Sequence, residues 1–254
     1  MPESGPDAHA PAAVFRVPRA STVDLIAVEL RAAIHSGALV VGGPIGEVEI
    51  ASQLGVSRSP LREAAQRLVQ EGLLTSTPGR GLRVATIRPE DLRDLYDARV
   101  AIESQAIRLV VARANARDIA EIEAALSTLM TASEGTDARK IGDADIAFHH
   151  SMVIQAGNSR LERYFSGLAI ETRIASFSMS DGYVVRRDVS PSYRAIVDAI
   201  AAGDSGAAIA ALESQMSDAV ARLSGEPAEH GADYDTVEEP LTNDPLSLEP
   251  LNGR

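Results

Sequence analysis

Apolar residues recur at helical spacing along most of the chain, and they define three helices before residue 72. The first helix is predicted over 22–35, stops at Gly37, and has one apolar face formed by Leu25, Ile26, Leu30 and Ile34. A second, shorter helix is predicted over 45–54. The third follows the turn at Gly55, and its buried face is formed by Leu61, Ala64, Ala65 and Leu68.

A β-hairpin is predicted directly after the third helix. Gly72 ends that helix, Leu73 and Leu74 begin a strand, and 82–84 alternates as the returning strand. Between them, 77–81 reads TPGRG, which consists largely of turn-forming residues. A helix pair, a third helix and a hairpin together indicate a winged helix-turn-helix, so we assign 21–88 to a DNA-binding domain of this type.

The next segment, 89–223, is predicted to be entirely helical, because no stretch of it alternates convincingly as a strand. Pro89 marks the linker, since proline suits the first turn of a helix and disfavours helix in the residue before it. The predicted helices cover 90–114, 117–133, 138–156, 159–180, 188–202 and 205–223. The predicted fold class is therefore mainly α, with an N-terminal winged helix-turn-helix and a C-terminal all-α bundle.

Both ends of the chain are predicted to be disordered: an arm at 1–20 and an acidic tail at 224–254. The formal net charge is −12, but it is unevenly spread. Over 57–88 there are six arginines against two glutamates, whereas 224–254 holds eight acidic residues and one arginine. A small basic tip on an acidic body is compatible with specific DNA binding and discourages non-specific binding along the duplex.

Several classes of protein are excluded by what the sequence lacks. The chain contains no cysteine, so it has no disulfide, zinc–thiolate site or thiol chemistry. No apolar run is long enough to span a membrane, and the N-terminal segment does not read as a signal peptide. We therefore expect a cytoplasmic protein without a membrane partner.

The third helix carries the candidate DNA contacts. Ser57 is the expected N-cap, whose hydroxyl accepts a backbone N–H of the first turn. Arg58, Arg62 and Gln66 follow at intervals of four and form a stripe that points away from the core. Arg80 lies at the tip of the hairpin. A guanidinium can bind guanine O6 and N7 or clamp a phosphate. The alternatives are an ordinary solvated helix face, or a winged helix that binds a protein instead of DNA.

Four segments carry a resemblance to a known family. They are VSRSPLREAAQRLVQEGLL followed by PGRG, LYDARVAIE at 95–103, DIAFHHSMVIQAGN at 145–158 and YRAIVDAIAAGD at 193–204. The chain resembles the GntR family of bacterial regulators, in the FadR-like subgroup with an all-helical C-terminal domain of the FCD type. The resemblance covers about 22–223.

The resemblance implies a homodimer that binds a palindromic double-stranded DNA operator and an effector that alters the relation between the DNA-binding domains. Effectors of such proteins are small carboxylates, sugar acids, amino acids or acyl thioesters. It also implies DNA contacts at Ser57, Arg58, Arg62 and Gly79. The chain departs from the pattern at Val48, where some members carry an arginine.

Asp145 and His149 are four residues apart on one predicted helix and could begin a Zn²⁺, Ni²⁺ or Mn²⁺ site. Many members of the subgroup add two more histidines, and this chain has Tyr193 and Gln215 at those positions. His150 is the only other histidine of the helical domain, and it points about 100° away around the helix. We therefore predict no cofactor, with a weakly bound divalent metal at Asp145 and His149 as the alternative.

Arg99 falls on the apolar stripe of its helix, four residues after Leu95. A buried charge is costly unless it is paired, so either Glu103 or a ligand anion must neutralise it. Arg173 and Tyr193 are further candidates for the same ligand. The candidate effector site is therefore Arg99, Asp145, His149, Arg173 and Tyr193.

The prediction for the whole chain is a ligand-responsive, DNA-binding transcription repressor and not an enzyme. The helical domain would sense a small organic anion or an acyl thioester without a metal. One alternative is the same regulator with a metal-bound carboxylate at Asp145 and His149. A remote alternative is an all-helical metal-dependent hydrolase, which needs more His and Asp ligands than the helical domain supplies.

Overall fold

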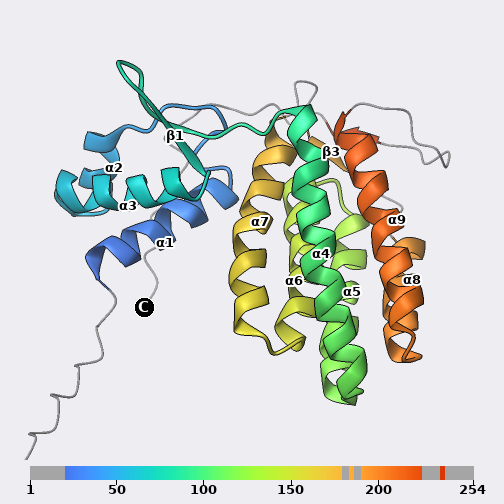
Figure 1. Cartoon of the computed structure of the whole chain (residues 1–254). Coiled ribbons are helices and arrows are strands. Elements are labelled where there is room, and N and C mark those ends of the chain that lie inside the picture. The colour runs from blue at the N-terminus through green and yellow to red at the C-terminus, as the bar shows by residue number, and fades with distance from the viewer. Residues whose placement is uncertain (1–20, 179–182, 186–189, 225–234, 238–254) are drawn as a thin grey trace, which may run out of the picture.

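The computed structural model describes residues 21–178, 183–185, 190–224 and 235–237. Two helical parts lie side by side, with the N-terminal part next to one edge of the C-terminal bundle (Figure 1). The predicted N-terminal arm at 1–20 and most of the predicted tail lie outside the described residues.

The N-terminal part is a winged helix-turn-helix, as predicted. Its elements are α1 (Thr22–His35), α2 (Glu47–Gln53), α3 (Arg58–Gln70), β1 (Leu74–Thr77) and β2 (Gly81–Val84). The two strands are antiparallel and form the wing, with Leu74 opposite Val84 and Thr77 opposite Gly81. The second helix is shorter than the predicted 45–54, because Ile45 instead pairs its backbone N–H with Leu82 of the wing.

The start of α1 is fixed by a capping box between Ser21 and Asp24. The hydrogen bond from the Ser21 hydroxyl, followed by that from Arg67, lowers the pKa of Asp24 to about 2. At the start of α3, Ser57 stands at the N-cap position in extended backbone, but its side chain makes no capping hydrogen bond with the described backbone. The predicted position of the Ser57 cap is thus right and its predicted hydrogen bond is absent from the described contacts.

The described residues of the C-terminal part form a bundle of six helices. They are α4 (Pro89–Arg113), α5 (Ala116–Ser133), α6 (Ala138–Gln155), α7 (Ser159–Phe177), α8 (Ser190–Ala201) and α9 (Ser205–Ser224). Each matches one predicted helix within a few residues, because residues next to each helix end determine where it begins or stops. Asn115 and Asn158 accept backbone N–H groups and cap α5 and α7.

Two short strands depart from the predictions. β3 (Tyr183–Val185) pairs antiparallel with β4 (Asp235–Val237). The first lies in a segment predicted to be strand-free, and the second lies within the predicted disordered tail. Three residues are too few to show alternation, and their partners are some fifty positions apart, so no local pattern indicates this pairing.

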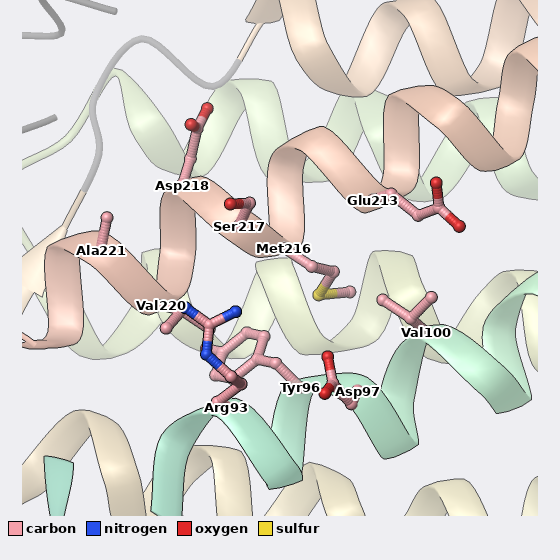
Figure 2. A pocket seen from close by; sticks show the side chains of 10 residues that line it. All are labelled: Arg93, Tyr96, Asp97, Val100, Glu213, Met216, Ser217, Asp218, Val220 and Ala221. Carbon is pink, nitrogen blue, oxygen red and sulfur yellow. The ribbon is translucent and has the colours of Figure 1, made fainter. Parts of the chain in front are cut away.

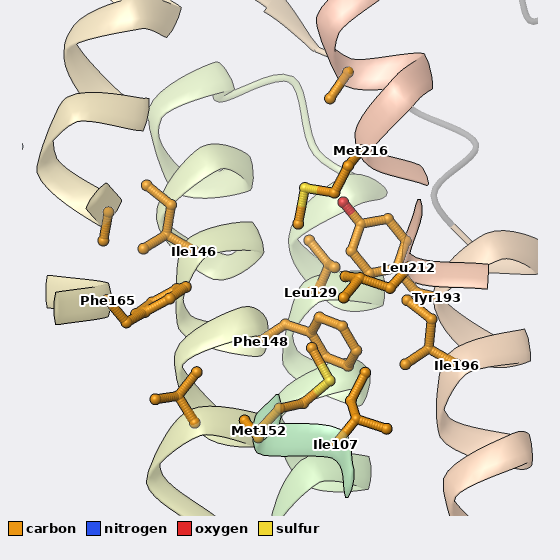
Figure 3. Close-up of a cluster of buried hydrophobic side chains, with 14 of the residues drawn as sticks. Ile107, Leu129, Ile146, Phe148, Met152, Phe165, Tyr193, Ile196, Leu212 and Met216 are labelled. Atoms are coloured by element: carbon orange, nitrogen blue, oxygen red, sulfur yellow. The ribbon is translucent and has the colours of Figure 1, made fainter. Parts of the chain in front are cut away.

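The main hydrophobic core lies inside the bundle, where Phe148, Met152, Phe165, Tyr193, Leu212 and Met216 meet (Figure 3). A second core fills the winged helix, and Ile170 and Ile174 of α7 belong to it. The two parts of the molecule therefore share buried apolar surface along the contact between α1 and α7. The Ser178 hydroxyl also accepts the backbone N–H of Ile87 in the linker.

We expect Ile174→Ala to destabilise the winged-helix domain by about 2–5 kcal/mol, because Ile174 is fully buried in that domain's core although it belongs to the bundle. Urea denaturation followed by circular dichroism would measure the loss. Ile154→Ala is the matched control, since Ile154 is 45% exposed. Equal stability of the two variants would contradict a core shared across the domain boundary.

Candidate DNA-binding and effector sites

The outer face of α3 carries the predicted DNA-binding residues. Arg58, Arg62 and Gln66 are all exposed, while the opposite face of the helix is buried under α1 and the wing. Among the described residues, Arg58 makes no ion pair and its guanidinium faces solvent. The structure therefore places this stripe where a DNA duplex would reach it.

The wing projects beyond the helices of the N-terminal part, with Arg80 exposed at its tip (Figure 1). Gly79 and Gly81 flank Arg80 in left-handed backbone, with φ of 79° and 72°. A side chain at Gly79 would strain this turn even though no atom lies within 4 Å of the position of a Cβ. The base of the wing is held by the Arg83 Nε–H, which donates to the carbonyl of Gly42 over 2.8 Å.

Arg62 is paired with Glu47, whose carboxylate Oε2 lies 2.5 Å from the guanidinium Nε. Glu47 is in the first turn of α2, so this pair ties the two helices of the helix-turn-helix together. Sequence reasoning missed Glu47, because the partners are 15 residues apart and lie on different helices. Next to it, Val48 is 66% exposed, which leaves an apolar side chain where some similar regulators carry arginine.

The centre of the bundle holds a buried charge. Arg99 of α4 is only 2% exposed, and its Nε–H donates to Glu103 over 2.9 Å. Its guanidinium also lies 5.4 Å from the ring centroid of Tyr96 and 5.7 Å from that of Phe165. The predicted pair with Glu103 is therefore present, yet the Nη2 atom of Arg99 is buried without a hydrogen-bond partner in the described part of the chain.

Glu103 connects Arg99 to His149 of α6. Burial alone would raise the pKa of Glu103, but the charge of Arg99 and the hydrogen bonds from His149 and Arg99 outweigh it and hold that pKa below its usual value. The second oxygen of Glu103 lies 2.5 Å from His149 Nδ1. Since an ionised carboxylate can only accept, the Nδ1 atom of His149 carries the proton of this hydrogen bond.

Two of the predicted residues complete the cluster around His149. Asp145 Oδ1 lies 3.7 Å from His149 Nε2, and the Tyr193 hydroxyl donates to the same carboxylate. Burial, reinforced by the negative charge of Asp145, raises the pKa of Tyr193 well above 10. The structure thus brings Arg99, Asp145, His149 and Tyr193 together, as the candidate site required.

The donor set around His149 does not fit a metal ion. A metal would need the free lone pair of Nε2, and the Gln215 amide of α9 donates to that atom over 3.1 Å. Asp145 is engaged by Tyr193, which is not a usual ligand of Zn²⁺, Ni²⁺ or Mn²⁺. Within the described ranges, no three His, Cys, Asp or Glu side chains gather into a possible metal site. Gln215 and Glu103 are therefore the hydrogen-bond partners of the two ring nitrogens of His149.

Arg173 lies elsewhere, at the junction between the two parts of the molecule. Its guanidinium donates to the backbone carbonyls of His35 and Arg139 and pairs with Asp143 over 2.7 Å. His35 ends α1, and Arg139 and Asp143 lie in the first half of α6. Arg173 is fully buried and joins three helices, so it is separate from the polar cluster around His149.

A groove of about 630 Å³ runs between α4 and α9 on the outside of the bundle (Figure 2). Its α4 side is lined by Arg93, Tyr96, Asp97 and Val100, and its α9 side includes Met216 and Val220. Tyr96 also packs against Arg99, so one buried ring separates the groove from the polar cluster.

Comparisons with known proteins agree with both parts of the structure. The model of the bacterial regulatory proteins of the gntR family matches residues 22–84, and that of the FCD domain matches 94–218. The chain is 36% identical over 171 residues to a Paenarthrobacter nicotinovorans protein named "Probable D-xylose utilization operon transcriptional repressor", covering 67% of this chain and 75% of the relative. The protein belongs to the GntR family. It is a DNA-binding transcription regulator of the FCD type, and such regulators are not enzymes.

Two further matches support the assignment. The Nta operon transcriptional regulator of Aminobacter aminovorans is 36% identical over 134 residues, covering 53% of this chain and 63% of that protein. The crystal structure of a GntR transcriptional regulator from Rhodococcus sp. RHA1 superposes with a TM-score of 0.69 at 28% identity, covering 80% of this chain and 97% of that one. No helix in the described part of this GntR regulator is long and apolar enough to cross a membrane.

We expect Arg62→Ala to weaken binding to a selected operator duplex by about 1–3 kcal/mol, because the variant loses a guanidinium that would contact a base or a phosphate. Glu47→Gln should instead raise affinity for unrelated DNA and lower discrimination, since it removes a negative charge and frees the Arg62 side chain. Fluorescence anisotropy with both duplexes would measure this. Arg160→Ala on α7 is the control for loss of one exposed positive charge. Unchanged binding by Arg62→Ala would favour a protein-binding role for the winged helix.

We expect Glu103→Gln to destabilise the bundle by about 3–5 kcal/mol, because it leaves Arg99 buried without a counter-charge. The folded-state pKa of Glu103 is depressed, so its contribution is present above the unfolded value near 4.5 and is lost as pH falls below it. Denaturation measured between pH 7 and pH 3 should show that the free energy of unfolding falls more steeply with decreasing pH in the wild type than in Glu103→Gln. The exposed Glu121→Gln control should stay within about 0.5 kcal/mol of the wild type, and a similarly small effect at Glu103 would contradict the paired charge.

Proposed function

We propose that this regulator is a homodimeric repressor that binds a palindromic operator and responds to a small organic anion without using a metal. The observation that carries the proposal is Arg99, a fully buried cation with one guanidinium nitrogen lacking a partner among the described residues. A buried donor without an acceptor costs about 1–3 kcal/mol. A carboxylate supplied by the effector would satisfy it, and an acyl thioester could do so through a carbonyl oxygen.

The operator contacts of the proposal are Ser57, Arg58, Arg62 and Gln66 of α3, with Gly79 and Arg80 of the wing. All six residues are exposed, which supports this assignment. We propose a homodimer because one recognition helix contacts only a few base pairs. Two copies bound to a palindrome would contact two half-sites and so twice as many base pairs.

The proposed signal travels along α6. This helix carries Asp145 and His149 in the polar cluster, and Arg139 and Asp143 at the domain junction. A shift of α6 on effector binding would alter the contacts of Arg173 with the carbonyl of His35, which ends α1. Since α1 packs against the recognition helix α3, the orientation of the DNA-binding domain would follow.

A metal-bound carboxylate at Asp145 and His149 is the second candidate, favoured only by their 3.7 Å approach. It requires the Gln215 amide to leave His149 Nε2. Both candidates predict an effector that changes DNA affinity, and they differ in whether a divalent ion is needed.

The deciding experiment measures metal content of purified, untagged protein by elemental mass spectrometry and operator release by a panel of carboxylates with and without EDTA. We expect substoichiometric metal and a release that EDTA does not change. Arg99→Met combined with Glu103→Gln, which removes both charges of the buried pair, should abolish the release. Near-stoichiometric zinc, nickel or manganese that is lost in His149→Ala would overturn the metal-free proposal.

A further inference from the structure

We propose that an acidic segment of this chain, residues 238–254, docks on the DNA-binding face of the N-terminal domain and competes there with DNA. This tail segment lies outside the described residues, and it would occupy Arg58 of α3 and Arg80 of the wing. The inference goes beyond the proposed function, which gives the tail segment no role. It shares with that function only the operator-contact face of α3 and the wing.

The place where the tail segment begins is set by strand β4. Val237 ends β4 and pairs with Tyr183 of β3, and β3 contacts α6 and α7. The same two helices meet the N-terminal domain, because Asp143 of α6 and Arg173 of α7 both approach His35 at the end of α1. Figure 1 shows β3 at the end of the bundle where the linker from the wing enters α4. The tail segment therefore begins on the part of the bundle that adjoins the DNA-binding domain.

The tail segment is long enough to reach the DNA-binding face. A fully extended chain spans about 3.3 Å per residue, so its seventeen residues reach up to about 55 Å. A folded chain of 254 residues has a radius of gyration of about 18 Å. Both α3 and the tip of the wing are therefore within reach, even for a segment that is not fully extended.

The charge of the tail segment is opposite to that of the DNA-binding face. The segment carries Glu238, Glu239, Asp244 and Glu249 against a single basic residue, Arg254. Aspartate and glutamate are ionised at neutral pH, so the segment is a short polyanion. Like the DNA backbone, it presents several negative charges in a row to a basic surface.

Arg58 and Arg80 are distinguished from the other arginines of the described N-terminal part. Both are exposed, and neither side chain makes an ion pair or a hydrogen bond there. The other arginines between 22 and 88 each contact an acceptor; they are Arg31, Arg62, Arg67, Arg83 and Arg88. The two guanidinium groups without a counter-charge therefore belong to the proposed operator contacts. They are the cations that remain for an anion from elsewhere in the chain.

Glu47 is a precedent for such a contact, because its carboxylate already pairs with Arg62 on the recognition helix. An ion pair between exposed side chains is weak by itself. A segment tethered to its target, however, acts at an effective concentration of about a millimolar, which lets several weak pairs hold it in place. DNA would displace the segment, because its phosphates offer more charges to the same face.

The docked segment would lower the affinity for every duplex by one common factor, because it stabilises the protein without DNA. The apparent Kd equals the intrinsic Kd divided by the fraction of molecules whose face is free. Salt screens exposed charges, so the factor should shrink as the salt concentration rises. Neutralising the tail segment should therefore tighten binding most strongly at low salt.

The first test measures DNA binding of the full-length protein by fluorescence anisotropy. The tail variant combines four substitutions: Glu238→Gln, Glu239→Gln, Asp244→Asn and Glu249→Gln. At about 50 mM NaCl we expect it to bind a selected operator duplex and an unrelated duplex about 3–10-fold more tightly than the wild type. The gain should be the same for both duplexes, and it should fall below about twofold at about 300 mM NaCl.

The matched control removes four exposed acidic charges from the bundle and so has the same net charge as the tail variant. Its substitutions are Glu121→Gln, Glu123→Gln, Glu134→Gln and Glu213→Gln. We expect the control to stay within about twofold of the wild type. An equal gain in the two variants would show a general effect of net charge, and this result or no gain in the tail variant would overturn the inference.

A second test detects the contact without DNA. The chain contains no cysteine and no tryptophan, so a dye attached at Ser247→Cys can report contact with one introduced tryptophan that quenches it. We expect Gln66→Trp on α3 to quench the dye more strongly than Glu121→Trp on α5, and high salt to remove the difference. Equal quenching by the two tryptophans would overturn docking on α3, even if the tail variant binds DNA more tightly.

Discussion

The bundle depends on neutralising one buried positive charge. Arg99 occupies an inward position on α4, where a guanidinium is tolerated only beside a counter-charge. Glu103 supplies that charge and fixes a proton of His149 on Nδ1, while the amide nitrogen of Gln215 contacts Nε2. One ion pair thereby connects the polar contacts of α4, α6 and α9. A polar cluster of this kind specifies the relative placement of its helices more sharply than apolar packing does.

Hydrogen bonds between protein side chains hold the same cluster together. In a three-histidine site, a cation would organise the ligands of several helices. Here Gln215 takes the position of one ligand and Tyr193 that of another, and both make hydrogen bonds within the protein. Nη2 of Arg99 and Oε1 of Gln215 are among the buried side-chain atoms that have no hydrogen-bond partner in the described residues.

Sequence reasoning succeeded where the information was local. The helix stops at Gly72 and Asn158, the wing turn and the Arg99–Glu103 pair all lie within a few residues of their determinants. It failed where the contact was long-range. His149 and Gln215 are 66 residues apart, and the contact between Arg173 and His35 spans 138. Arg173 shows the limit clearly, because an arginine on an apolar stripe can face a ligand or another domain.

The charge distribution of the chain limits its affinity for DNA, and this affinity decides how strongly an effector can change DNA binding. Allosteric coupling between two sites is worth about 1–3 kcal/mol, so an effector can release only a protein whose hold on DNA is moderate. The acidic body opposes non-specific binding, and Glu47 partly neutralises Arg62 on the recognition helix. Arg58 and the wing arginine Arg80 remain exposed. A DNA-binding surface of moderate strength suits a junction in which the buried Arg173 lies beside the apolar contact between α1 and α7, because a small shift there can then change DNA affinity.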